Sequence, residues 1–350
     1  MDTTESHTDL ADLESLKEAH ERILDQIHRV VVGQDETIEL LLISIFARGH
    51  CILEGVPGLA KTLLVQTLSE CLTLEFRRIQ FTPDLMPADI TGTEIIYEDK
   101  ETQHREFKFV RGPIFTNLLL ADEINRTPPK TQSALLEGMQ ERQVSTGGQR
   151  YPLPDPFFVL ATQNPIEQEG TYPLPEAQLD RFLMKVLVRY PTPDEERVIY
   201  RMNTGKTVTP PRHVLNGSQI LELQELVRRV PISDFLIDYT MRLVHASRKE
   251  NPSAPDFVKR FVMWGIGPRG GQSLILAAKA RAALAGKPEV SLEDLQHVAP
   301  PVLRHRLVLN YTAEAEGQTT DSVIARLLET VAMHESGSIE DEKIERVLKA

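Results

Sequence analysis

One short segment of the chain combines two glycines with a lysine and a threonine. The segment Gly55–Thr62 reads Gly-Val-Pro-Gly-Leu-Ala-Lys-Thr, follows the apolar run His50–Glu54 and precedes a helical pattern over Thr62–Cys71. A strand, a glycine-containing loop and a helix in this order are typical of a phosphate-binding loop. Gly55 and Gly58 let the backbone curl so that successive N–H groups converge on phosphate oxygens, and the helix N-terminus adds its dipole.

Two side chains of this loop would act on the nucleotide directly. Lys61 would hold the β- and γ-phosphates, and the hydroxyl of Thr62 would ligate Mg²⁺. Ala60 stands where a glycine is usual; its N–H remains available, and we expect it to adopt helical angles at the helix start. The residues predicted to contact the nucleotide from this segment are Gly55, Pro57, Gly58, Leu59, Ala60, Lys61, Thr62 and Leu63.

Two acidic residues end a later apolar strand. Asp122 and Glu123 directly follow the run Leu118–Ala121. In a doubly wound sheet the strand ends gather at one edge, so this pair can meet the phosphate loop there. Asp122 would bind Mg²⁺ directly or through water, and Glu123 would orient and deprotonate the attacking water. The pattern therefore points to hydrolysis of a nucleoside triphosphate.

An amide follows a further apolar strand, Phe157–Thr162. If this strand lies between the two strands above, Asn164 could hydrogen-bond the γ-phosphate or the attacking water. The alternative is an asparagine that merely starts a turn before Pro165. The order of the strands in the sheet decides between these two interpretations.

The elements that must position these residues lie between about residues 31 and 190. Short apolar runs alternate there with helical patterns, which indicates an α/β domain with a parallel sheet covered on both faces. Two segments, 92–111 and 143–153, are predicted to be inserted hairpins, the second with Gly147-Gly148 at its turn. The predicted strands are His50–Glu54, Phe76–Phe81, Leu118–Ala121, Phe157–Thr162 and Phe182–Val188.

The remaining segments are predicted to be helices and a linker. Residues 1–30 form an N-terminal helical segment, residues 191–215 are a linker rich in proline and threonine, and residues 216–310 form a smaller, all-helical domain. Residues 311–350 are expected to be a helical tail. The helices expected in the smaller domain are Ser218–Val230, Ser233–Glu250, Gly271–Ala285 and Leu292–Arg304, the last capped by Ser291 with Asp294 at its third position.

Composition excludes several classes of protein. The 350 residues suffice for about two domains, and 41% hydrophobic with 26% charged residues is ordinary for a globular chain. No apolar run approaches the roughly 18 residues of a membrane span. With only two cysteines, the chain cannot form a disulfide scaffold or a four-cysteine zinc site. The few cysteines and an acidic start unlike a signal peptide together predict a cytoplasmic protein. The net charge of −12 argues only weakly against nucleic-acid binding, which needs a local basic face.

The order of the motifs is similar to that of the MoxR family of AAA+ ATPases. The resemblance covers roughly residues 30–310 and rests on the phosphate loop, Leu118–Arg126, Ala161–Pro165 and Tyr172–Phe182. It implies an AAA+ core followed by a helical lid, with ATP or ADP and Mg²⁺ as ligands. The two predicted hairpins match those of the wider branch that includes magnesium chelatase motor subunits and replicative helicases.

The same resemblance implies roles for residues outside the phosphate loop. Asn164 would be sensor 1, and Arg181 would be the arginine finger that reaches the nucleotide of a neighbouring subunit, with Arg126 as a rival finger. Arg269 would be sensor 2 of the lid, acting in cis or in trans, although the two glycines that follow it would loosen a helix start. The segment that would flank the adenine consists of Val32, Gly33 and Gln34.

The resemblance also implies a chaperone-like motor that matures partner complexes, often with a von Willebrand factor A domain protein. A finger that acts across an interface requires a head-to-tail ring, which we expect to be a homo-hexamer. Two alternatives stay open. A nucleic-acid motor would need basic stripes with stacking platforms, but hairpin 143–153 carries only Arg150 and segment 92–111 mixes both signs of charge. A scaffold without turnover would not need the pair of acids Asp122 and Glu123.

Overall fold

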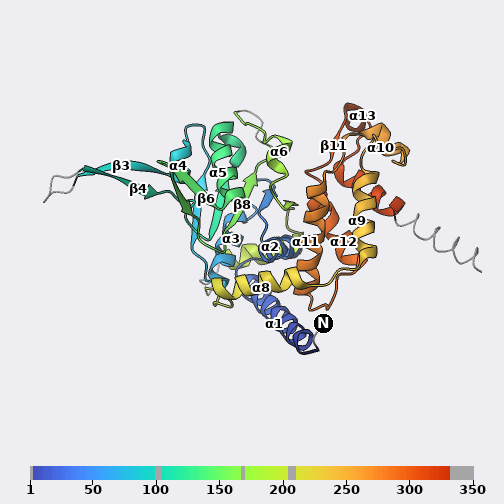
Figure 1. Cartoon of the computed structure of the whole chain (residues 1–350), viewed down its shortest axis with the longest axis horizontal. Coiled ribbons are helices and arrows are strands. Elements are labelled where there is room, and N and C mark those ends of the chain that lie inside the picture. Colours follow the sequence, from blue (N-terminus) through green and yellow to red (C-terminus); the bar gives the residue numbers. More distant parts are fainter. Residues whose placement is uncertain (1–2, 99–104, 167–169, 204–209, 332–350) are drawn as a thin grey trace, which may run out of the picture. The chain divides into compact units, whose positions relative to one another are not determined.

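The computed structural model describes residues 3–98, 105–166, 170–203 and 210–331 (Figure 1). The chain divides into two compact units, Met1–Arg229 and Val230–Ala350. In the described part of the chain, no helix combines the length and apolar character needed to cross a membrane.

The first unit is built on a five-stranded parallel sheet with strand order β2-β5-β8-β1-β9. All five predicted strands are present, each within two residues of its predicted ends. Because β8 lies between β5 and β1, the condition stated for Asn164 is met. The strands are β1 (Cys51–Glu54), β2 (Phe76–Gln80), β5 (Leu118–Asp122), β8 (Phe158–Gln163) and β9 (Met184–Leu187).

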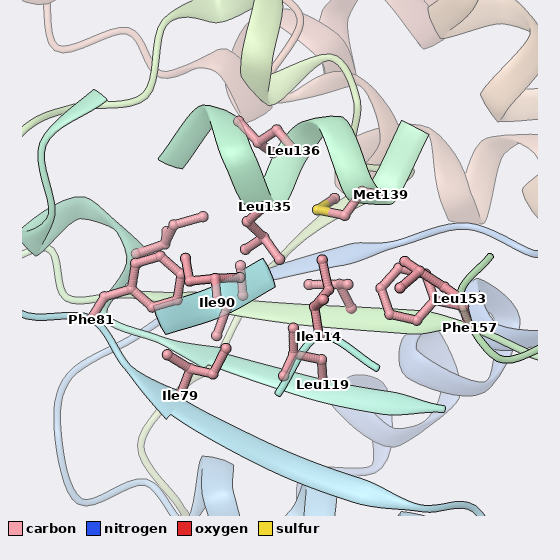
Figure 2. Packing of buried hydrophobic residues seen from close by; sticks show 14 of the residues in the cluster. Ile79, Phe81, Ile90, Ile114, Leu119, Leu135, Leu136, Met139, Leu153 and Phe157 are labelled. Carbon is pink, nitrogen blue, oxygen red and sulfur yellow. The ribbon is translucent and has the colours of Figure 1, made fainter. Parts of the chain in front are cut away.

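The central strands are buried on both faces. Every residue of Leu118–Ala121 has no exposed surface, and successive side chains of a strand point to opposite faces, so both faces of the sheet are covered. On one face, Leu135 and Met139 of α5 (Pro129–Glu141) lie over the sheet and its Leu119 (Figure 2). The polar ends of these strands emerge from this core at one edge of the sheet.

Helix α7 corrects the predicted linker. Residues 191–215 are not a plain linker, because an eleven-residue helix begins at Pro193 and carries three acidic residues in its first turn. Proline at the first helical position and acids beside the helix N-terminus both favour this start. The other helices of this unit are α1 (Thr3–His28), α2 (Asp35–Phe46), α3 (Lys61–Cys71), α4 (Pro87–Thr91), α6 (Glu176–Leu179), α8 (Gly217–Arg229) and the 3₁₀ turn η1 (Ile124–Arg126), with α7 at Pro193–Asn203.

Helix α8 corrects the predicted domain boundary. The sequence places this helix in the smaller domain, but it packs on α1 and α2 of the first unit. The buried Gln224 amide of α8 donates to the carbonyl oxygen of Ile45 at 2.7 Å. The first unit therefore ends at Arg229, not near residue 215.

Both predicted hairpins are present in the first unit. Strands β3 (Gly92–Glu98) and β4 (Arg105–Arg111) pair antiparallel, and so do β6 (Gln143–Thr146) and β7 (Gln149–Pro152). Figure 1 shows β3 and β4 extending as a narrow ribbon away from the sheet; residues 99–104 lie outside the described residues. Phe109 of β4 stacks on Tyr151 of β7 with ring centroids 4.3 Å apart, so the two hairpins are in contact.

The second unit is mainly helical but not all-helical as predicted. Strands β10 (Val262–Trp264) and β11 (Val308–Leu309) form a small antiparallel ladder. Ser291 and Asp294 form the predicted capping box. The helices are α9 (Asp234–Ala246), α10 (Asp256–Phe261), α11 (Pro268–Leu284), α12 (Leu292–Leu303) and α13 (Tyr311–Ala315).

The segment after residue 310 belongs to the second unit as far as it is described. A helix over residues 320–331 buries Val323, Ile324 and Leu327, so this part is packed and not a separate tail. The rest of the predicted tail, 332–350, lies outside the described residues.

Candidate active site

The predicted phosphate loop and the polar strand ends share one cavity of about 470 Å³. The loop joins β1 to α3, and the cavity lies at the edge where β5 and β8 end. It contains the predicted base, metal ligands and sensor, because parallel strands bring their carboxyl ends to the same edge. The lining residues are Pro57, Gly58, Leu59, Ala60, Lys61, Thr62, Leu63, Arg78, Gln80, Asp122, Glu123, Thr162 and Asn164.

The ammonium of Lys61 lies within the phosphate loop itself. Its Nζ donates to the carbonyl oxygen of Gly55 at 2.5 Å. Burial lowers the pKa of Lys61, while the charges of Asp122 and Glu123 act in the opposite direction. Gly55 has no room for a side chain, since a Cβ would lie 2.9 Å from atoms of Val188. A phosphate entering the cavity could replace the Gly55 carbonyl as the acceptor of the lysine N–H groups.

The expectation of right-handed helical angles for Ala60 is wrong. Ala60 precedes α3 in the left-handed region, with φ 55° and ψ 22°. An L-residue there brings its Cβ too close to the following carbonyl, at a cost of roughly 1–2 kcal/mol. Gln34 and Glu123 also have positive φ values, 61° and 58°, so three of the predicted site residues are backbone-strained.

Replacing Ala60 by glycine is expected to raise the free energy of unfolding of the nucleotide-free protein by about 1 kcal/mol. The relief of strain is partly offset by the greater chain entropy of glycine in the unfolded state. Denaturant unfolding measures the difference. The control is Ala11→Gly in the exposed face of α1, where glycine should destabilise by about 1 kcal/mol. Equal destabilisation by both substitutions would contradict a strained Ala60.

Asp122 is held on both of its carboxylate oxygens. Oδ1 accepts from the hydroxyl of Thr162 at 2.6 Å, and Oδ2 accepts from Nε and Nη2 of Arg78 at 3.1 and 2.6 Å. The Thr162 oxygen also accepts the backbone N–H of Glu123 at 2.8 Å. One threonine hydroxyl of β8 thus holds the carboxylate of Asp122, at the end of β5, and the backbone of the Glu123 that follows it.

Glu123 is held by an amide and a guanidinium. Its Oε2 accepts from Nε2 of Gln80 at 2.8 Å and from Nη1 of Arg126 at 3.0 Å. Gln80 in turn accepts from Nη2 of Arg78 at 2.7 Å, so a continuous network joins β2 to β5. Both contacts are made by the same carboxylate oxygen, Oε2.

Sequence reasoning missed three residues of this network, Arg78, Gln80 and Thr162. Gln80 lies opposite Asp122 in the register of β2 and β5, so Arg78 and Gln80 share the face of the strand that carries Asp122. The sequence signal for Arg78 and Gln80 was that two polar residues, spaced two apart, lie on one face of β2. A neighbouring strand that ends in acids could then pair with them. This signal becomes informative only once the pairing of these two strands is known.

The position of Asn164 is compatible with both interpretations of the sequence. Its side chain is buried and lines the polar cavity, as a sensor requires. Its Oδ1 also accepts the backbone N–H of Ile166 at 3.1 Å, which is the turn-starting contact of the alternative reading. The turn fixes the side chain at the cavity wall.

A second, largely apolar cavity of about 330 Å³ adjoins the phosphate loop. It shares Pro57–Ala60 and Leu63 with the polar cavity, so the two together fit a nucleoside and its phosphates. Val32 and Gln34 line it as predicted. The other lining residues are Val30, Val31, Tyr190, Pro191, Glu196, Ile199, Tyr200 and Met202.

Gly33 and Gln34 shape the wall of this second cavity. Nε2 of Gln34 donates to the carbonyl oxygen of Arg189 at 3.0 Å, and its Oε1 accepts from the hydroxyl of Thr37. Gly33 has a φ of 66°, and a Cβ there would overlap the carboxylate of Glu195 at 2.1 Å. A larger residue at this position would therefore be strained by its backbone angle and would displace the Glu195 side chain; Gly33 is not among the residues that line the cavity.

The donor set at the phosphate loop fits Mg²⁺ bound together with a nucleotide. Thr62 and Asp122 offer hard oxygen ligands in one cavity. Within the described ranges, no cluster of three or more His, Cys, Asp or Glu side chains could hold a metal by itself. Phosphate oxygens and water would therefore complete the six-fold coordination that Mg²⁺ prefers.

The three predicted arginines lie in different settings. Arg181 is half-buried in the turn between α6 and β9, and it is not among the described residues that line either cavity. Arg126 is bonded to Glu123 of its own chain. Arg269 is exposed in the first turn of α11, in the second unit.

The expected loosening of the helix after Arg269 is wrong. Helix α11 begins at Pro268, before the two glycines. Gly270 is required by packing, because a Cβ there would lie 2.4 Å from Ile266 and 3.1 Å from Arg306.

Known proteins resemble this chain over nearly its whole length. Residues 50–184 match the ATPase family associated with various cellular activities (AAA), and residues 257–327 match the AAA lid domain. The chain is 48% identical to Chaperone MoxR1 of Mycobacterium tuberculosis, over 91% of this chain and 83% of that protein. It is 31% identical to Protein MoxR of Methylorubrum extorquens, over 90% and 95% of the two chains. This chain belongs to the MoxR family of AAA+ ATPases.

A solved structure supports the same fold for this MoxR-family protein. A protein of Cytophaga hutchinsonii that was assigned as an ATPase matches with a TM-score of 0.84 and 43% identity, over 91% of this chain and 96% of that one. The lid match lies wholly within the second unit and extends past residue 310, which agrees with the corrected boundaries of that unit.

Proposed function

We propose that this MoxR-family protein hydrolyses ATP to ADP and phosphate with Mg²⁺ and uses the cycle to remodel or mature partner protein complexes. The observation that carries the proposal is the single cavity that contains Lys61, Thr62, Asp122, Glu123 and Asn164. These side chains supply phosphate binding, metal ligation, a general base and a polar sensor. A scaffold that only binds nucleotide would not need the last two.

The proposed mechanism begins with the exchange of contacts that the free chain makes with itself. Lys61 leaves the Gly55 carbonyl for the phosphates. Thr62 and Asp122 would hold Mg²⁺, which would supply charge neutralisation at the phosphate oxygens. Glu123 leaves Gln80 and Arg126 and accepts a proton from the attacking water. Asn164 hydrogen-bonds the γ-phosphate or that water.

The proposed working form is a homo-oligomeric ring, with a hexamer as the expected size. Arg181 lies outside the described cavity walls of its own chain, which is compatible with a finger directed at a neighbour's nucleotide. Arg269 of the lid would face the phosphates. A client protein, with a von Willebrand factor A domain protein as the candidate, would be activated by the ring in the cytoplasm.

The β3–β4 hairpin is the proposed client contact. Its Ile96 and Phe107 lie directly opposite each other in the ladder and are 65% and 76% exposed. Ile95, Tyr97 and Val110 are also exposed. Exposed apolar side chains grouped in this way are typical of a protein-binding surface, and this ribbon contacts the β6–β7 hairpin through Phe109 and Tyr151.

The β6–β7 hairpin would carry motion from the nucleotide to that surface. It leads directly into β8, which ends beside Asn164. Both turn residues, Gly147 and Gly148, have positive φ values, as a two-residue hairpin turn requires. A shift of Asn164 when the γ-phosphate is lost would therefore tilt the hairpin as a rigid lever.

Shortening the turn Gly147–Gln149 is expected to leave basal ATP turnover within a few-fold and to abolish client activation. The same split is expected for Phe107→Ser, and the control is Tyr311→Ser, an apolar residue that is 83% exposed in the second unit. The measurement is paired on each preparation: phosphate release in Mg²⁺ and in EDTA, and activation of the candidate client, a von Willebrand factor A domain protein. Client activation that survives both hairpin variants would place the force-bearing surface elsewhere.

A further inference from the structure

A cation of the protein occupies the carboxylate that would bind the metal. Arg78, in β2, donates from Nε and Nη2 to the same oxygen, Oδ2 of Asp122. An ionised carboxylate oxygen has two lone-pair sites, and this arrangement uses both of them. Oδ1 already accepts the hydroxyl of Thr162. The carboxylate therefore has one acceptor site left for a metal ion or a metal-bound water.

The two partners of this ion pair differ in their exposure. The Asp122 side chain is 13% exposed, whereas the Arg78 side chain is 47% exposed. A carboxylate buried to this degree needs a counter-charge, and the free chain supplies Arg78 while Lys61 is bonded to Gly55. Because the guanidinium lies at the rim of the cavity, it can leave Asp122 for solvent without any change in the core.

A guanidinium and a divalent cation on the same carboxylate oxygen would repel each other. Oδ2 has no lone pair left for Mg²⁺ or a metal-bound water, and a cation at the remaining site on Oδ1 would still lie beside the guanidinium of Arg78. The neighbouring acid shows the same pattern, since Glu123 is bonded to Arg126. Each acid of the pair is thus paired with an arginine of its own chain.

We propose that Arg78 is a resident counter-ion of Asp122 that competes with Mg²⁺ for this carboxylate. This role rests on the proposed function, because it assumes that the site takes a nucleotide with Mg²⁺. Arg78 is a positioning residue: it pairs with the carboxylate that would bind the metal and thereby sets the Mg²⁺ concentration at which the site fills.

The test is the Mg²⁺ dependence of ADP binding, which involves no turnover. ADP affinity is measured by calorimetry over a range of Mg²⁺ concentrations for the wild type, Arg78→Gln and Arg77→Gln. Arg77 is the matched control, because it is an equally exposed arginine of the same strand that bonds Glu75 instead. We expect Arg78→Gln to lower the half-maximal Mg²⁺ concentration about tenfold, with ADP affinity at saturating Mg²⁺ no weaker than wild type. Arg77→Gln should change neither.

A second measurement addresses the metal directly. Titration of Mn²⁺ in the presence of ADP, followed by the electron paramagnetic resonance signal of the free ion, should show tighter metal binding by Arg78→Gln. If that variant fails to fold, Arg78→Lys is the second choice. Lysine keeps the positive charge but cannot donate two N–H groups in the fixed geometry of a guanidinium, so we expect metal binding to tighten by a smaller factor.

The outcomes separate this inference from the proposed function. If Arg78 were a phosphate ligand, Arg78→Gln would weaken ADP binding at every Mg²⁺ concentration without moving the half-maximal point, and the inference would be overturned. An unchanged or raised half-maximal Mg²⁺ concentration would also overturn it. If the wild type itself shows no Mg²⁺-dependent ADP binding, the proposed function fails.

Discussion

Replacing Glu123 by glutamine is expected to lower ATP turnover by about 10²–10⁴-fold while ATP binding is retained. Glutamine has nearly the same shape but cannot accept a proton from the attacking water, and a positioned general base contributes a factor of this size. Asp122 and Thr162 are untouched, so the metal ligand keeps its place. Phosphate release measures the turnover of this variant, and an ATP titration of the same preparation measures its affinity.

Two further variants define that result. Lys61→Ala should lose nucleotide affinity, because it removes the charge that faces the phosphates, whereas Glu123→Gln should not. Glu137→Gln, in an exposed position of α5, is the matched control and should behave as wild type. A turnover rate of Glu123→Gln close to that of the wild type would show that this carboxylate is not the base.

Replacing Arg181 by alanine is expected to lower ATP turnover by about 10³-fold or more, since an arginine finger supplies about 10³–10⁵ in related phosphoryl transfers. Its planar guanidinium spreads charge over the phosphate oxygens in a way that lysine cannot copy. Mixing Arg181→Ala with Lys61→Ala should restore part of the activity. In a mixed ring, the intact nucleotide site of an Arg181→Ala subunit can face the intact Arg181 of a neighbouring Lys61→Ala subunit.

Protein concentration provides an independent check of action between subunits. Specific activity of the wild type should rise as the protein assembles. Activity per subunit that stays flat down to a demonstrably monomeric concentration would contradict the trans role of Arg181. Arg126→Ala tested in the same mixing experiment decides between the rival fingers, because Arg126 contacts Glu123 within its own chain.

Local patterns in the sequence predicted the α/β fold and most of the residues that line the polar cavity. The glycine-containing loop at Gly55–Thr62 has a strong signature, because strand, loop and helix must follow each other directly. The five strands were identified by runs of apolar residues that both faces of a covered sheet require. The hairpin at Gly147-Gly148 was equally clear, because few residues other than glycine adopt two successive positive φ values.

Contacts between distant segments could not be predicted in the same way. Arg78 and Asp122 are brought together by the register of β2 against β5, and nothing in either strand alone specifies that register. Ala60 was misjudged because backbone angles at a helix N-cap depend on the loop that precedes it. Helix α8 was misplaced because an apolar stripe shows that a helix is buried, but not against which partner.

The packing of α8 determines how the chain can be divided into fragments. A fragment that ends at residue 190 or 215 would leave the Ile45 carbonyl without its buried amide partner, Gln224. It would also expose the surfaces of α1 and α2 on which α8 packs, and it would lack the buried Ile220 and Val227 of that helix. We therefore expect an ATP-binding half produced without its lid to be well behaved only if it runs through Arg229, and shorter versions to aggregate through the newly exposed apolar surface.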